Sequence, residues 1–140
     1  RRVLFRSGAL VAGNHAGLIY NSWPLMDGSF LPDVVFFDWQ NKGAEAFFDG
    51  IAVVQFNHRL TAYLLLALAL LHAHQMGKAY PSSSARKRAL INVWLLSVQA
   101  ATGIATLVMV VPMHLAMTHQ AFAMLVLGMT AAHAAACRSR

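Results

Sequence analysis

The chain has few charged residues for its length. Only 11% of its 140 residues are Asp, Glu, Lys or Arg, whereas 58% are hydrophobic. A soluble domain carries charge on about a quarter of its residues, because its surface must be hydrated, so this composition excludes a soluble globular domain of this size. We therefore expect an integral membrane protein that contacts lipid over most of its surface.

Cysteine and acidic residues are also scarce. The single cysteine, Cys137, excludes a disulfide framework within the chain and a cysteine-rich metal cluster. Five acidic residues against eleven basic ones give a net charge of +6. The basic residues lie at the ends of apolar runs and do not alternate with aromatic residues, so we predict no nucleic-acid partner.

Three apolar stretches are long enough to cross a bilayer, which takes about 20 helical residues. They cover residues 53–76, 89–111 and 114–136. A fourth stretch, residues 8–24, is shorter, and we interpret it as the end of a truncated transmembrane helix. The predicted fold is all-α, a transmembrane four-helix bundle whose first helix is truncated.

The first seven residues, 1–7, have a sequence that can be back-translated into the end of a common sequencing adapter. We therefore expect them to be an assembly artefact that takes no part in the fold. The natural N-terminus is then expected to lie upstream of the sequence given.

Charge differs between the segments that connect the apolar stretches. All five acidic residues fall within residues 25–52, where Pro32, Gly43 and Gly50 should interrupt any long helix. Residues 77–88 contain four basic residues and no acidic one. The positive-inside rule predicts that residues 25–52 face outward, and that residues 77–88 and the C-terminus face the cytoplasm or the mitochondrial matrix.

Seven histidines are unusual in so apolar a chain, because a transmembrane imidazole normally needs a hydrogen bond, water or a metal. His58 and His119 each lie about five residues into a helix that runs inward, so their rings should reach the same depth. Two imidazoles facing each other across a helix bundle are the usual axial ligands of a low-spin haem iron. We predict that these two histidines ligate the iron. Arg59 is placed to pair with a haem propionate or to extend toward lipid phosphates.

A second histidine pair repeats the same spacing. His72 follows His58 by 14 residues, and His133 follows His119 by 14, which is close to four helical turns. This spacing allows a second haem, which would make the chain a cytochrome b-like electron carrier. Against it, His72 and His133 lie near the basic boundary, where histidines are often only interfacial. A third possibility is a structural or transporter-like bundle whose histidines are only hydrogen-bonded.

Within the apolar stretch 89–111, Gln99 and Gly103 are one helical turn apart. A polar residue and a glycine at this spacing are typical of a polar crosslink beside a close helix contact. We therefore expect this face of the helix to pack against a neighbouring helix.

Four segments of the chain match the motifs of one known family. Residues 13–26 (GNHAGLIYNSWPLM) match AG-x-x-YN-[ST]-[WF]-P-x-M, and residues 55–59 (QFNHR) match Q-F-x-H-R. Residues 99–106 (QAATGIAT) match Q-x-x-x-G-I-x-T, and residues 112–120 (PMHLAMTHQ) match P-x-x-x-A-x-x-HQ. In this order the motifs resemble the fifth to eighth helices of the haem A synthases.

The resemblance implies an eight-helix protein of two pseudo-twofold halves, of which this chain would be the C-terminal half. It implies a membrane oxidoreductase that oxidises the C8 methyl group of haem O to the formyl group of haem A for cytochrome oxidase. By the same resemblance His58 and His119 would ligate a haem b, and we assign Arg59 and Gln120 as further cofactor-binding residues.

The resemblance also implies what this half lacks. The catalytic carboxylate and the substrate haem O would belong to the N-terminal half, so we expect no catalytic residue here and no activity from this half alone. The expected partners are membrane lipid and haem, with haem O synthase and a second copy of the chain as further candidates. The expected location is the bacterial or mitochondrial inner membrane.

Overall fold

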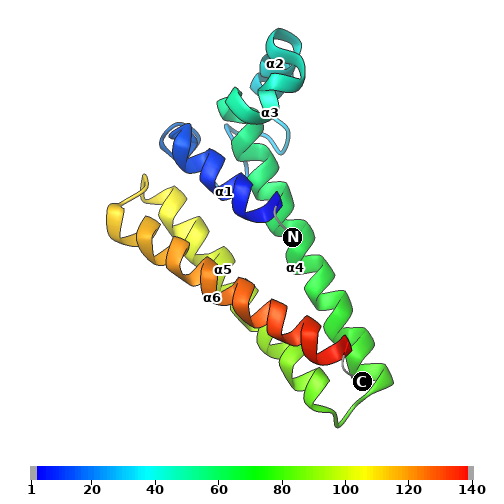
Figure 1. Ribbon diagram of the computed structural model, residues 1–140. Helices are drawn as coiled ribbons and strands as arrows, with labels where there is room; N and C mark the ends of the chain where they lie inside the picture. Colours follow the sequence, from blue (N-terminus) through cyan, green and yellow to red (C-terminus); the bar gives the residue numbers. More distant parts are fainter. Residues whose placement is uncertain (1–2, 139–140) are drawn as a thin grey trace. The chain divides into compact units, whose positions relative to one another are not determined.

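The computed structural model describes residues 3–138, and these are predominantly helical (Figure 1). They contain no β-strand, only an isolated bridge between Met26 and Ser29. The predicted all-α class is confirmed. The elements in chain order are α1 (Val3–Gly13), the 3-10 helix η1 (Ala16–Leu18), α2 (Asp33–Lys42), the 3-10 helix η2 (Gly43–Glu45), α3 (Ala46–Asp49), α4 (Ile51–Ala79), α5 (Ser84–Val108) and α6 (Met113–Arg138).

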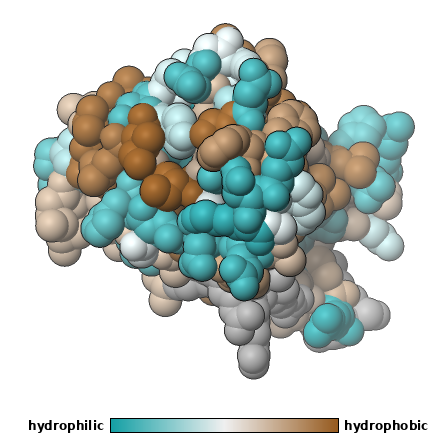
Figure 2. Space-filling view, turned by 90° about the horizontal axis from the view of Figure 1, so that it is seen from above, coloured by the Kyte–Doolittle hydropathy of each residue, from teal (hydrophilic) through white to brown (hydrophobic). Residues whose placement is uncertain are grey.

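Three helices, α4, α5 and α6, are long and apolar enough to cross a membrane. They have 29, 25 and 26 residues, against about 20 needed for the hydrocarbon core. Large apolar side chains on them are exposed, including Leu64, Leu68 and Leu125 at 57%, 52% and 51%. Figure 2 shows apolar residues in brown at the surface beside polar residues in teal. This surface suits lipid tails, and the chain is a multi-pass membrane protein.

The ends of α5 differ from the predicted range 89–111. The helix begins at Ser84, because the Ser83 hydroxyl accepts a hydrogen bond from the backbone N–H of Arg86 at 3.2 Å and caps the first turn. The basic residues that follow have a high helix propensity but are not apolar, so the range predicted from hydropathy begins after them. α5 ends at Val108, since Val110 and Val111 take left-handed φ angles of 61° and 55°.

The segment predicted as one helix over residues 8–24 is a helix end followed by a turn. α1 stops at Gly13, where Asn14 donates to the Leu10 carbonyl through both its backbone N–H (2.9 Å) and Nδ2 (3.0 Å). His15 follows with a left-handed φ of 52°, a common way to end a helix. Of the expected artefact, residues 1–2 lie outside the described residues, and residues 3–7 form the first part of α1.

Residues 25–52 contain short helices, and the breaks between them lie at the proline and glycines that were predicted to interrupt a long helix. α2 follows Pro32 and ends before Gly43, and α3 ends before Gly50. A Cβ at Gly50 would lie 2.7 Å from the carbonyl oxygen of Ala46, so a larger residue does not fit there. Asp38 then accepts a hydrogen bond from the backbone N–H of Ala52 at 3.2 Å. A carboxylate placed at the N-terminus of α4 by another helix, here α2, favours the start of α4.

The chain divides into two compact units. One runs up to Ala62 and includes Ile104–Pro112, and the other comprises Tyr63–Gly103 and continues from Met113. Both α4 and α5 contribute to each unit. His58 lies in the first unit, whereas His72, His119 and His133 lie in the second.

Candidate functional site

In the first unit, two side chains of α4 clamp the segment that follows α1. Gln55 donates through Nε2 to the carbonyl oxygens of Ala16 (3.0 Å) and Tyr20 (3.1 Å). Arg59, one turn further on, donates through Nη2 to Tyr20 (2.9 Å) and through Nη1 to the carbonyl of Leu25 (3.2 Å). Gln55 is only 2% exposed, so water does not compete for these bonds. The Gln and Arg of the motif at residues 55–59 therefore have a structural role.

The same segment is attached to the end of α5 by a glycine and an asparagine. Asn21 donates through Nδ2 to the carbonyl oxygen of Leu107 at 3.0 Å and also to that of Gly17. A Cβ at Gly17 would lie 2.9 Å from Cγ2 of Val111, so the backbone comes closer than any larger residue allows. These contacts give the Gly and Asn of the motif at residues 13–26 a packing role.

His58 lies directly beside this clamp and is half-buried on α4. A Cβ placed on Gly8 would lie 3.8 Å from the ring carbon Cε1 of His58. The backbone of α1 therefore approaches the imidazole at a residue without a side chain. Gln55 and Arg59 therefore attach the neighbouring segment to the turns of α4 that carry His58.

In the second unit, the His119 ring of α6 packs against α5. The hydroxyl Oγ1 of Thr102 lies 3.2 Å from Nδ1 of His119. Nε2 of Gln99 lies 3.1 Å from Nδ1 and 3.3 Å from Nε2 of the ring, and it donates to the His119 carbonyl oxygen at 3.1 Å. A Cβ at Gly103 would lie 2.8 Å from Cε1 of His119. The imidazole thus lies directly over the glycine, and any larger residue there would displace it.

The polar crosslink and close contact predicted for Gln99 and Gly103 are confirmed, and their partner is His119. The sequence did not reveal this partner. Gln120, which was predicted to bind the cofactor beside His119, is exposed, and the polar contacts of the ring come from Thr102 and Gln99 on α5. The spacing from Gln99 to Gly103 was the one signal that could have identified these contacts.

One polar atom near His119 is left without a partner. Oε1 of Gln99 is buried and accepts no hydrogen bond from the part of the chain that the structure describes. A buried acceptor without a donor costs about 1–3 kcal/mol, so such an atom is uncommon in a folded protein.

His72 and His133, the second pair with the 14-residue spacing, bind each other. Their Nε2 atoms lie 2.8 Å apart, and their ring centroids are 5.1 Å apart at an interplanar angle of 67°. His133 is 6% exposed. Because the two Nε2 atoms share one hydrogen bond, no space is left between them for an iron. This geometry pairs one nitrogen of each ring and does not support a second haem.

A metal ion held by protein side chains alone has no candidate site in residues 3–138, since no group of three or more His, Cys, Asp or Glu residues could hold one. A haem iron needs fewer protein ligands than a free metal ion, because the porphyrin supplies all but the axial ligands. His58 and His119 fit that requirement chemically. Each is an imidazole on a long apolar helix with a glycine beside its ring.

Comparisons with known proteins agree with these motifs. A model of the COX15-CtaA family, described as cytochrome oxidase assembly protein, matches residues 3–131. The Heme A synthase of Methylobacterium sp. (strain 4-46) is 53% identical over 127 residues, which cover 91% of this chain and 35% of that protein. The Heme A synthase of Methylobacterium nodulans is 50% identical with the same coverage.

A relative with a lower sequence identity carries the same name. The Heme A synthase of Brucella anthropi is 46% identical over 129 residues, which cover 90% of this chain and 35% of that protein. The chain therefore spans about a third of the length of the curated relatives it matches. No solved structure matches it significantly.

Proposed function

The chain belongs to the COX15-CtaA family of cytochrome oxidase assembly proteins, and we propose that it forms the C-terminal, haem b-binding half of a haem A synthase. The relatives that bear this name are 46–53% identical to this chain over about nine tenths of its length. The observation that carries the haem assignment is the environment of His119, whose ring is oriented by Thr102 and Gln99 over the bare backbone of Gly103.

In this proposal His58 and His119 are the two axial ligands of one haem iron. A ligating histidine usually donates the N–H of its second nitrogen to a partner, which fixes the tautomer and the ring orientation. For His119 that partner is Thr102, because its hydroxyl lies 3.2 Å from Nδ1. The hydroxyl hydrogen already points to the Gln99 carbonyl at 2.9 Å, so the oxygen is available as an acceptor. The Nε2 atom of His119 would then carry the lone pair for iron, and the Gln99 amide, whose Nε2 lies 3.3 Å from it, would have to turn away.

Arg59 supplies a fixed positive charge beside His58. The carbonyl oxygens of Tyr20 and Leu25 hold its guanidinium in place, which argues against free extension toward lipid phosphates. A fixed guanidinium stabilises a nearby carboxylate by a charge-assisted contact, so we keep Arg59 as the residue that favours a haem propionate. We assign the orientation of His119 to Gln99 and Thr102, and Gln120 stays a proposed cofactor-binding residue.

The haem of this half, when bound, supplies one-electron transfer at a bis-histidine iron. The whole protein would oxidise the C8 methyl group of haem O to the formyl group of haem A for cytochrome oxidase, in the bacterial or mitochondrial inner membrane. The substrate haem and the catalytic carboxylate would belong to the other half, so this half alone would be inactive. Haem O synthase and a second copy of the chain are candidate partners.

Haem stoichiometry tests the proposal against a two-haem electron carrier. We expect the purified chain to bind one haem per chain with low-spin b-type Soret and α bands. The His58→Ala, His119→Ala double variant should lose these bands. The matched His72→Ala, His133→Ala double variant should keep them, because those rings are bound to each other. Two haems per chain, with the second lost from the control variant, would favour the carrier and defeat the proposal.

A further inference from the structure

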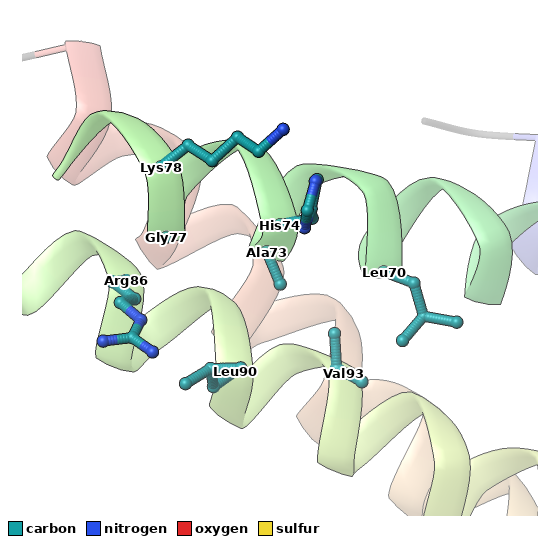
Figure 3. Close-up of a pocket in the computed structure, with 8 residues that line it drawn as sticks. All are labelled: Leu70, Ala73, His74, Gly77, Lys78, Arg86, Leu90 and Val93. Atoms are coloured by element: carbon teal, nitrogen blue, oxygen red, sulfur yellow. The ribbon is translucent and has the colours of Figure 1, made fainter. Parts of the chain in front are cut away.

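A groove between α4 and α5 combines two positive charges with an apolar wall (Figure 3). Its volume is about 400 Å³. Lys78 of α4 and Arg86 of α5 line it at the end near the connection between the two helices, and Leu70, Ala73, Leu90 and Val93 line it further along the helices. The groove therefore changes from cationic to apolar along its length.

One of the two cations of the groove, Arg86, is held in a defined geometry. Arg86 donates through Nη1 to the carbonyl oxygen of Pro81 at 2.8 Å, which fixes the guanidinium beside the connection. A Cβ at Gly77 would lie 3.6 Å from Nε of Arg86, so the backbone of α4 passes close to the guanidinium. Lys78 lies in the last turn of α4, one residue from Gly77.

These charges have no carboxylate partner nearby in the sequence. All five acidic residues lie between Asp27 and Asp49, so residues 50–140 contain none. No acidic side chain of residues 50–140 can pair with Lys78 and Arg86, so an anion from outside the chain would complement them. A free inorganic phosphate would satisfy Lys78 and Arg86 but would leave the apolar part of the groove unused.

We propose that this groove binds one anionic phospholipid, with its phosphate between Lys78 and Arg86 and the start of an acyl chain along Leu70, Ala73, Leu90 and Val93. Basic pockets between transmembrane helices bind such headgroups, because the charge and the hydrocarbon are recognised together. Each Lys or Arg near the headgroup is worth about 1 kcal/mol, which is roughly fivefold in binding.

Quenching of Trp94 measures this preference directly. Trp94 follows Val93 on α5 and is 63% exposed, so a bromine on a bound acyl chain can reach it. For this test a Trp23→Phe, Trp39→Phe variant is used, so that Trp94 is the remaining tryptophan. The variant is reconstituted in phosphatidylcholine vesicles that contain an equal fraction of either brominated phosphatidylglycerol or brominated phosphatidylcholine. We expect the brominated phosphatidylglycerol to bind about 25-fold more strongly, from the two cations together. Equal quenching by the two lipids would overturn the proposal.

Variants separate a built site from general surface charge. Lys78→Gln and Arg86→Gln should each lower the preference about fivefold. The matched control Lys87→Gln removes the same charge from an exposed residue outside the groove and should change the preference less than about twofold. A loss in Lys87→Gln as large as in Arg86→Gln would overturn the proposal, and circular dichroism checks that each variant is folded.

A further variant keeps both charges and fills the groove. Gly77→Leu places a side chain against the lipid position and favours α4, since leucine forms helix better than glycine. We expect it to lose most of the preference for phosphatidylglycerol. Retention of the full preference in Gly77→Leu, or its removal by inorganic phosphate in solution, would show that the groove does not hold a phospholipid.

Discussion

Two of the histidines on α6, His119 and His133, lie 14 residues apart and differ in their surroundings. His119 lies over Gly103, with the hydroxyl of Thr102 beside Nδ1. Nε2 of His133 is instead hydrogen-bonded to Nε2 of His72 at 2.8 Å. The two residues lie about four helical turns apart, yet Nε2 of His133 is hydrogen-bonded to a second imidazole, whereas Nε2 of His119 lies 3.3 Å from the Gln99 amide nitrogen. The facing helix, and not the spacing, therefore decides what each ring contacts.

The largest expected effect comes from filling the space under His119. In Gly103→Leu, the new side chain would occupy the position of the ring, because even a Cβ would lie 2.8 Å from Cε1. We expect haem affinity to fall by roughly 100-fold, the upper range for residues that orient a ligand. Gly128→Leu on α6 is the matched control, since a Cβ there meets nothing within 4 Å. Equal haem binding by the two variants in a titration would break the distinction.

Removing the Nδ1 partner of His119 should have a smaller effect. Thr102→Val keeps the shape of the side chain and deletes the hydroxyl, so we expect haem affinity to fall about tenfold. Thr130→Val is the control, because that hydroxyl donates to the Val126 carbonyl of its own helix at 2.8 Å. If both variants bind haem like the unmodified chain, Thr102 does not orient the ligand.

The pair formed by His72 and His133 should stabilise the fold without affecting haem. A double-mutant cycle with His72→Ala and His133→Ala should give a coupling of about 1 kcal/mol in the free energy of unfolding, typical of one hydrogen bond. Haem content should stay at one per chain in all three variants. No coupling in the cycle would mean that the two rings do not bind each other.

The smallest effect is expected at Cys137, one turn after His133. Its Sγ lies 3.9 Å from both ring nitrogens of His133 and is exposed, so the contact is weak. Cys137→Ser should change the free energy of unfolding by less than about 0.5 kcal/mol. Tight zinc binding that this variant abolishes would instead make the inner histidines a metal centre.

The sequence predicted the long elements because an apolar run of membrane length has few alternatives to a helix. The predicted ranges 53–76 and 114–136 lie inside α4 and α6. The range 8–24 differed, since apolar character continues past Gly13 while the side chain of Asn14 bonds back to Leu10 and ends α1. A hydropathy pattern does not predict such a hydrogen bond from a side chain to the backbone.

Side-chain partners were harder to predict than helices. Spacing places His72 and His133 on their helices but does not say which ring nitrogen meets which neighbour, so a second haem remained an alternative. For the same reason Gln120, adjacent to His119 in sequence, was predicted instead of Thr102, which lies 17 residues away on α5. Contacts between helices depend on their rotation about their axes, which one sequence does not specify.

The direct test of axial ligation by His58 and His119 is rescue with free imidazole. Each single variant, His58→Ala and His119→Ala, should convert the ferric haem from a six-coordinate low-spin to a high-spin spectrum, and added imidazole should restore the low-spin bands in both. Low-spin bands that persist in either variant without imidazole would show that the removed histidine does not ligate the iron.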